Sequence, residues 1–210
     1  MPISAQSKVG FVTALMLVAF AWPAPAAAQS SISAQTKNID ALLDQSFNAM
    51  YNLRFDEAQR LAEDAKNMAQ DDPVPWVAQA CAVLFREFDR MHILRSELFG
   101  SDNEFIDGPA IAWEPQARKE FDNALSTVEK LGQARLKQAK DDPRALFALS
   151  LANGLRADDA ALIAKKKFSA LSYTKTSTGY AERLLARYPD YYDAYIGTGM
   201  GKYIIGGKAA

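Results

Sequence analysis

One helix-ending signal recurs along this chain at long intervals. Asp71-Asp72-Pro73 returns 70 residues later as Asp141-Asp142-Pro143, and in a looser form as Tyr188-Pro189-Asp190. Proline fixes its own φ and disfavours helical geometry in the residue before it, so each signal ends one helix and prepares the start of the next. The recurrence therefore predicts a series of helices joined by short turns.

Hydrophobic spacing before the first of these turns indicates a helical hairpin. Apolar residues fall three and four positions apart from Ile39 to Tyr51, and the same spacing resumes from Phe55 to Met68. The three residues between, 52–54, are too few for anything but a turn. Two amphipathic helices with so short a link lie antiparallel, because each has one stripe to bury.

The rest of the chain continues in helices, and nothing in it alternates as a strand does. We expect one helix of some two dozen residues from Trp76 to Leu98 and another from Pro115 to Lys140. A third follows Pro143, a fourth carries Phe168, Leu171, Tyr180, Leu184 and Leu185, and a last one runs from Asp193 to Ile205. Residues 100–112 form a long connection, which we expect Phe105 and Ile106 to hold against the core. The predicted fold class is all-α.

Short motifs within these helices carry a resemblance to a known family. Phe55-Asp56-Glu57-Ala58 and Phe121-Asp122-Asn123-Ala124 share one pattern, and an aromatic residue precedes a small one by four positions at Trp76 with Ala80 and at Tyr195 with Gly199. Leu146 with Ser150 is a weaker example. The chain resembles a degenerate tetratricopeptide-repeat (TPR) protein, a family built from helix-turn-helix units of about 34 residues.

That resemblance covers residues 39–205 and implies a TPR-like α-solenoid of antiparallel helix pairs. It is firmest over residues 42–88, and the interval between Pro143 and Pro189 departs from the family spacing. Proteins of this family are generally scaffolds that hold another protein in a concave groove. Val77, Cys81, Leu84 and Phe85 would face such a groove or lie buried, and burial is the expectation.

The N-terminal residues have the composition of a secretory signal. Lys8 precedes an apolar run of 14 residues, Val9 to Trp22, and the small residues 26–28 follow two prolines. The run is short of the roughly 20 apolar residues that span a membrane, although an uncleaved anchor is the alternative. We expect residues 1–28 to be removed by cleavage after Ala28, 29–38 to be a flexible leader and 206–210 a flexible tail. The protein would then be exported, periplasmic or secreted, without stable membrane insertion.

Charge and cysteine content narrow the functional classes. The chain has 24 Lys and Arg against 25 Asp and Glu, without the concentrated basic face that nucleic-acid binding needs. Cys81 is the single cysteine, so no disulfide forms within the chain. Its apolar neighbours indicate a small buried side chain.

The residues offer little chemistry for catalysis. His92 is the single histidine, which makes a zinc site improbable, and we expect it on a helix surface. The segment 197–202 is rich in glycine, but a phosphate-binding loop would need Gly at 196 and Ser or Thr at 203, where Ile196 and Tyr203 stand. Three glycines there instead indicate a closely packed helix. No cofactor or metal site is predicted.

Tyrosines gather toward the C-terminus. Tyrosine is enriched at protein interfaces, and stacking between repeats is the competing explanation. The last helix is apolar and is followed by no partner that could cover it, so it is a possible assembly surface. The candidate partner-binding residues are Tyr188, Tyr191, Tyr192, Tyr195 and Tyr203.

These observations predict a non-catalytic protein–protein interaction scaffold of the bacterial cell envelope, binding a protein or peptide partner. Two alternatives remain open from the sequence. One is an α-solenoid that binds a small ligand or a glycan through aromatic side chains. The other is a helical hydrolase that uses His92 with an acidic residue.

Overall fold

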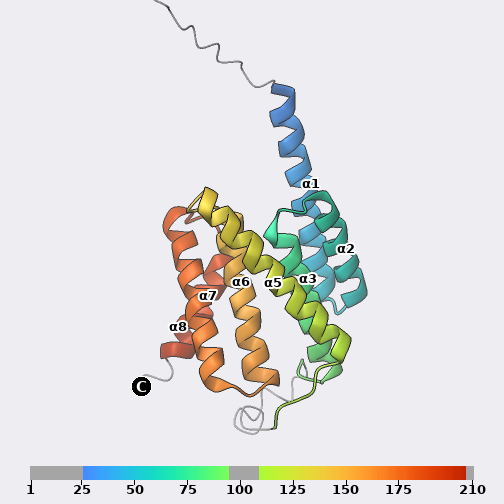
Figure 1. Cartoon of the computed structure of the whole chain (residues 1–210), viewed down its shortest axis with the longest axis vertical. Helices are drawn as coiled ribbons and strands as arrows, with labels where there is room; N and C mark the ends of the chain where they lie inside the picture. The colour runs from blue at the N-terminus through green and yellow to red at the C-terminus, as the bar shows by residue number, and fades with distance from the viewer. Residues whose placement is uncertain (1–25, 95–108, 207–210) are drawn as a thin grey trace, which may run out of the picture.

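The computed structural model describes the backbone of residues 26–94 and 109–206, and the side chains of residues 35–94 and 109–199 together with Lys202. All regular secondary structure in these ranges is helical, which confirms the all-α prediction (Figure 1). The elements are α1 (Ala26–Tyr51), α2 (Phe55–Met68), α3 (Pro73–Arg90), α5 (Pro115–Gln138), α6 (Pro143–Asp158), the π-helical turn η2 (Asp159–Ile163), α7 (Lys167–Arg187) and α8 (Ala194–Gly206).

The two Asp-Asp-Pro turns start helices as the sequence predicts. The side chain of Asp72 caps α3 by accepting a hydrogen bond from the Val74 amide, and that of Asp142 caps α6 by accepting one from Ala145. Each capping oxygen satisfies one of the backbone N–H groups that a helix start leaves unpaired. The third signal ends α7 before Tyr188, but α8 begins only at Ala194.

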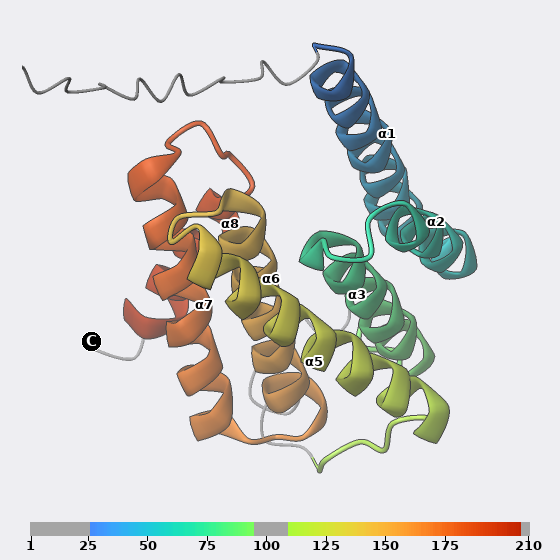
Figure 2. The same cartoon turned by 45° about the horizontal axis from the view of Figure 1, so that its top comes forward.

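Each helix packs against the next one along the chain, and alternate helices also meet. In addition to the consecutive contacts, α1 packs on α3, α3 on α6, and α6 on α8. Helix α5 runs obliquely across α3 and α6, with α7 beside α6 and α8 behind α7 (Figures 1 and 2). One hydrophobic core runs from Ile39 in α1 to Ala194 in α8.

Helix α6 is enclosed by its neighbours on nearly all sides. Residues 145–150 are all buried, as their nearly uniform apolar character predicts. Val77, Cys81 and Leu84 of α3 are buried as well, and Phe85 is partly buried, so the expectation of burial on this helix is confirmed. A helix that is surrounded by neighbours has no face left to make polar.

The end of α3 differs from the prediction. The helix stops at Arg90 and not near Leu98, and a turn of residues 91–94 follows it. His92 lies in this turn with a positive φ of 62°, exposed to solvent, so its placement on a helix surface was wrong. The turn lets Ile93 reach the core, where its side chain is buried. This burial favours the turn over a continuation of the helix. Phe105 and Ile106 lie outside the described residues.

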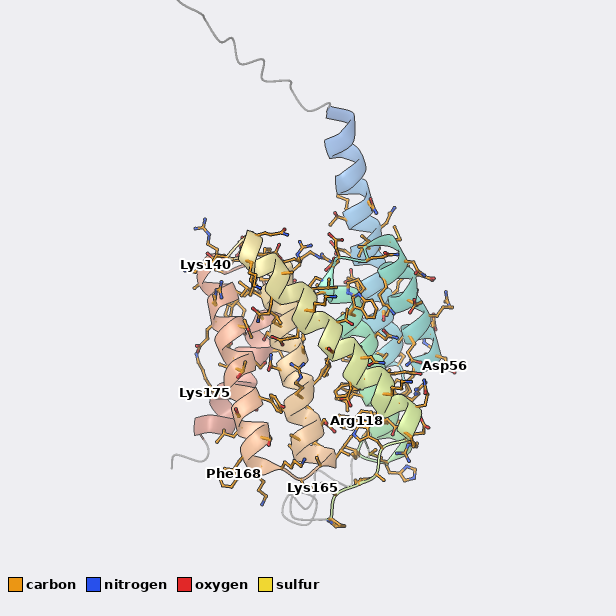
Figure 3. All side chains as sticks on the ribbon, viewed as in Figure 1. Asp56, Arg118, Lys140, Lys165, Phe168 and Lys175 are labelled. Atoms are coloured by element: carbon orange, nitrogen blue, oxygen red, sulfur yellow. The ribbon has the colours of Figure 1, made fainter. Side chains whose placement is uncertain are left out.

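Helix α7 buries only part of the apolar set that its sequence shows: Leu184 is fully buried, and Tyr180 and Leu185 pack against the core. Phe168 is 92% exposed and Leu171 is exposed too, so neither belongs to the core. Phe168 projects from the N-terminal end of α7 near Lys165 (Figure 3). The rest of the buried face of this helix is made of small and hydroxyl-bearing residues: Ala170, Thr174, Ser177, Thr178 and Ala181.

The N-terminal segment is helical from Ala26, so residues 29–38, predicted as a flexible leader, belong to α1 in this structure. The side chains of residues 35–38 are exposed, and Ile39 is the first buried one among the described side chains. The early part of α1 accordingly extends beyond its neighbours (Figure 2). Packing thus begins where the sequence predicts, whereas helical geometry begins earlier. Residues 207–210 of the predicted tail lie outside the described residues.

Among the described helices, none combines the length and the hydropathy that crossing a membrane requires.

Candidate functional site

The candidate tyrosines differ in environment. Tyr191 is half-buried, and its ring lies against Phe147 with the centroids 5.1 Å apart. Loss of hydration raises the pKa of Tyr191 to about 12. Tyr191 therefore joins α6 to the segment before α8, as the stacking alternative expects, and the binding role of the tyrosines stays a prediction.

The other candidate tyrosines near the C-terminus are more open. Tyr188, Tyr192 and Tyr195 are exposed, and the Tyr195 hydroxyl donates a hydrogen bond to the Pro189 carbonyl at 3.2 Å. The side chain of Tyr203 lies outside the described residues. The rings of the four described tyrosines line neither of the two cavities considered below, but Asp193 and Ile196 of the same segment line one of them.

That cavity, here named the recess, lies between α1, α6, α7 and α8 and has a volume of about 530 Å³. Helix α6 supplies the largest part of its lining, with α1 on one side and α8 on the other. Two large apolar side chains of the lining, Tyr51 and Ile196, are 74% and 70% exposed. The apolar lining comprises Phe47, Tyr51, Phe147, Leu151, Ala157 and Ile196, with Ala194 beside them.

The charged groups of the recess are all of one sign. Asp44 from α1, Asp158 at the end of α6 and Asp193 just before α8 line it, and the lining contains no Lys, Arg or His. Within the described part of the chain, none of these three carboxylates takes part in an ion pair. The chain as a whole is nearly neutral, so the recess concentrates uncompensated negative charge.

Asp158 has the most perturbed environment of the three. Asp158 is exposed by its accessible surface, although protein atoms surround its carboxyl group on most sides. This loss of hydration disfavours the ionised form and raises the pKa of Asp158 to about 7. The thiol of Cys81 is buried close by, and burial together with the charge of Asp158 raises its pKa to about 12. Cys81 is therefore a protonated core residue and no nucleophile.

Hydroxyl groups of α7 form the remaining wall of the recess. Ser177 donates to the Ser150 carbonyl at 2.8 Å, and Ser150 donates to the Ser177 carbonyl at 2.9 Å, which ties α7 to α6. The Thr174 hydroxyl donates to its own helix at Ala170. Thr178 differs: it is only 8% exposed, and its hydroxyl has no hydrogen-bond partner among the described residues. A buried polar group of this kind costs free energy unless something else satisfies it.

Sequence reasoning did not find the recess. Asp44, Asp158 and Asp193 lie on three elements and are far apart in the chain, so no local pattern relates them. The sequence of α1 contained one weak sign of a charged group near the cavity: Asp44 lies three residues before Phe47, a residue of the apolar stripe. Only the packing of α1 and α8 around α6 brings these side chains to one cavity.

A second hollow, the trough, lies between α5, η2 and α7 and has a volume of about 1070 Å³. Its guanidinium groups are already neutralised. Arg118 pairs with Asp159 at 2.8 Å and with Asp122 at 2.8 Å, and Arg156 pairs with Glu129 at 3.3 Å. Lys130, Lys137 and Lys166 also line the trough, so its lining keeps an excess of positive charge. Its large apolar side chains Phe121 and Leu125 are fully buried, which makes the trough the weaker candidate for a partner that needs open apolar surface.

The described residues contain no group of three or more His, Cys, Asp and Glu side chains arranged to hold a metal ion. The three aspartates of the recess therefore do not converge on one point. Their arrangement suits several separate contacts along a ligand.

Comparison of the chain with models of protein families, with curated proteins and with solved structures gives no match.

Proposed function

We propose that this chain is an exported, TPR-like α-solenoid that acts as a non-catalytic interaction scaffold and holds a segment of a partner protein in the recess. The recess carries the proposal. It combines open apolar side chains with carboxylates that the described part of the protein leaves unpaired, and exposed apolar surface beside unsatisfied polar groups is characteristic of a recognition site.

The order of packing supports a repeat architecture. Helices α1, α3, α6 and α8 contact each other in sequence order, and α2, α5 and α7 follow them as second helices of successive pairs. In a TPR-like array the first helices of each pair line the inner face, and three of the four helices that line the recess, α1, α6 and α8, are first helices in this assignment. Periplasmic or secreted localisation rests on the N-terminal segment and is part of this proposal.

The packing positions of the repeats agree with this arrangement in the first two pairs, α1 with α2 and α3 with α5. Ala80, Ala58 and Ala124, the small partners of the aromatic positions, are essentially buried. The aromatic–small residue pair of α8, Tyr195 with Gly199, does not pack in this way. Tyr195 is half exposed, and a Cβ at Gly199 would meet no atom within 4 Å. Among the described side chains of α8, the buried ones are Ala194 and Thr198, one position earlier in each case.

Site-specific photocrosslinking tests the scaffold proposal. A photoreactive phenylalanine analogue at Tyr51 or Ile196 should form protein adducts in cell-envelope extract. The same analogue at Phe168, which is more exposed but lies outside the recess at the end of α7 (Figure 3), is the matched control. Adducts of equal yield at all three positions, or none at the recess positions, would contradict the proposal.

A small-ligand binding protein is a second candidate, because the recess volume lies within the roughly 300–1,000 Å³ of typical ligand pockets. A ligand screen by thermal shift separates the two functions. A ligand that stabilises the protein and loses its effect in Ile196→Glu, while envelope extract yields no adduct, would favour the small-ligand function. The hydrolase alternative has weaker support, since His92 is exposed in a turn and lines neither cavity.

A further inference from the structure

We infer that the segment bound in the recess is cationic and apolar at once: a peptide stretch in which Lys or Arg alternates with large hydrophobic side chains. This inference rests on the proposed function and specifies the chemistry of its partner.

The first argument is the sign of the charge. Asp44, Asp158 and Asp193 face the recess without a basic residue in its lining. The acidic groups of the trough are compensated within the protein, because Asp122 and Asp159 are both paired with Arg118. A partner that brings positive charge would supply the same compensation in the recess, while an acidic partner would be repelled.

The second argument is the separation of the charges. The three carboxylates come from α1, the end of α6 and the start of α8, and they do not gather into a metal-binding group. A single compact cation could reach one of them only. A segment with several spaced ammonium or guanidinium groups could reach all three, because Lys and Arg side chains are long and flexible at the stem.

The third argument is the apolar surface between the charges. Phe47, Phe147 and Leu151 line the recess, and Tyr51 and Ile196 stand open at it. A hydrophilic polycation would leave this surface in contact with water, whereas apolar side chains between its charges would cover it. The recess therefore suits an amphipathic segment.

Three designed peptides of equal length test this chemistry on the full chain. One alternates Leu with Lys, one alternates Leu with Glu, and one alternates Ser with Lys, each carrying a fluorescent label for anisotropy. The Leu–Lys peptide should bind about tenfold tighter than either other peptide, and added salt should weaken its binding.

Variants place the binding in the recess. Asp44→Asn with Asp193→Asn should weaken Leu–Lys binding at least about fivefold, because both losses remove attraction at the site. The control is Asp56→Asn with Asp64→Asn, which changes the net charge equally on α2, away from α7 and α8 (Figure 3). Circular dichroism checks that all variants are folded. Equal effects of the two pairs would overturn the inference.

The outcomes also distinguish this inference from the scaffold proposal. Equal or tighter binding of the Leu–Glu peptide, lost in Ile196→Glu, would overturn the cationic partner and leave the scaffold standing. Absence of binding by all three peptides would overturn the inference as well. Only if crosslinking at Tyr51 and Ile196 also gave no adduct would the scaffold proposal fall with it.

Discussion

Arg144 joins the two Asp-Asp-Pro turns by donating from its Nε to Asp72 Oδ2 at 2.7 Å. Its Nη1 donates to Asp40 Oδ1 at 2.7 Å, so one guanidinium group connects α6 to the start of α3 and to α1. The other oxygen of Asp72 caps α3. The acidic turns thus do two things: they begin helices, and they bind neighbouring helix pairs to one another.

The first prediction concerns this connection. Arg144→Ala should lower the free energy of unfolding by about 2–3 kcal/mol, because it leaves the buried carboxylate of Asp72 without its cation. Arg144→Lys should recover only part of this loss, since an ammonium group cannot reproduce the two directed contacts. Urea unfolding followed by circular dichroism measures both.

Arg60→Ala is the matched control for Arg144. Arg60 pairs with Asp64 on the exposed surface of α2, where an ion pair contributes little, so its loss should change stability by no more than about 0.5 kcal/mol. If Arg144→Ala lowers the free energy of unfolding no more than Arg60→Ala does, the connection between the two turns does not stabilise the fold.

Much of the fold follows from signals that are local in the sequence. The Asp-Asp-Pro turns cap α3 and α6, and the three-and-four spacing from Ile39 marks where packing begins. The predictions failed for parts of two helices, α7 and α3, and each failure has a physical reason. Helix α7 buries hydroxyl-bearing residues such as Ser177, which donates a hydrogen bond to α6. Because these residues are polar, the hydrophobic pattern of the sequence does not mark them as buried. Helix α3 ends early because His92 adopts a left-handed conformation that its residue type does not announce.

The recess could not be predicted from local patterns in the sequence. It depends on which helices meet, and Asp44 and Asp193 have no relation in sequence that would place them at one cavity. The sequence pointed to the tyrosines of residues 188–203 instead. Tyr191 proves to pack on Phe147, although Asp193 and Ile196 from the same segment do line the recess.

The second prediction compares two helical glycines. A Cβ built at Gly132 in α5 would lie 2.8 Å from the Cγ of the buried Leu149 in α6, whereas one at Gly179 in α7 would meet nothing within 4 Å. Gly179→Ala should therefore stabilise the protein by up to about 1 kcal/mol through helix propensity. Gly132→Ala should destabilise it by about 1–3 kcal/mol, because overpacking outweighs the same gain. Chemical unfolding that gives both variants the same sign would refute the close approach of α5 and α6.

The third prediction concerns the N-terminal part of α1. Cleavage after Ala28 would remove only the first residues of this helix, and the first buried side chain described is Ile39. A chain that begins at Gln29 should therefore melt at the same temperature as the full chain. Intact-mass measurement of the exported protein should show Gln29 as its first residue. A large drop in melting temperature would mean that residues 1–28 contribute to the fold.

The fourth prediction follows from the raised pKa of Asp158. Since this pKa is about 7 in the folded protein and about 4 for an ordinary aspartate, the folded state holds the proton more tightly than the unfolded state does. The resulting stabilisation is present below about pH 4 and is lost as the pH rises through about 7. Asp158→Asn, which stays neutral, should therefore raise the melting temperature at pH 8 more than at pH 4.

Asp64→Asn on the exposed surface of α2 is the control for Asp158→Asn. Its effect on the melting temperature should not be larger at pH 8 than at pH 4. The comparison also bears on function. If ionised Asp158 costs stability because the described protein gives it no cation, the Leu–Lys peptide should raise the melting temperature of the wild-type protein at pH 8. It should raise that of Asp158→Asn less, because the variant has no charge there to compensate. An equal rise in both proteins would mean that the peptide does not meet this carboxylate.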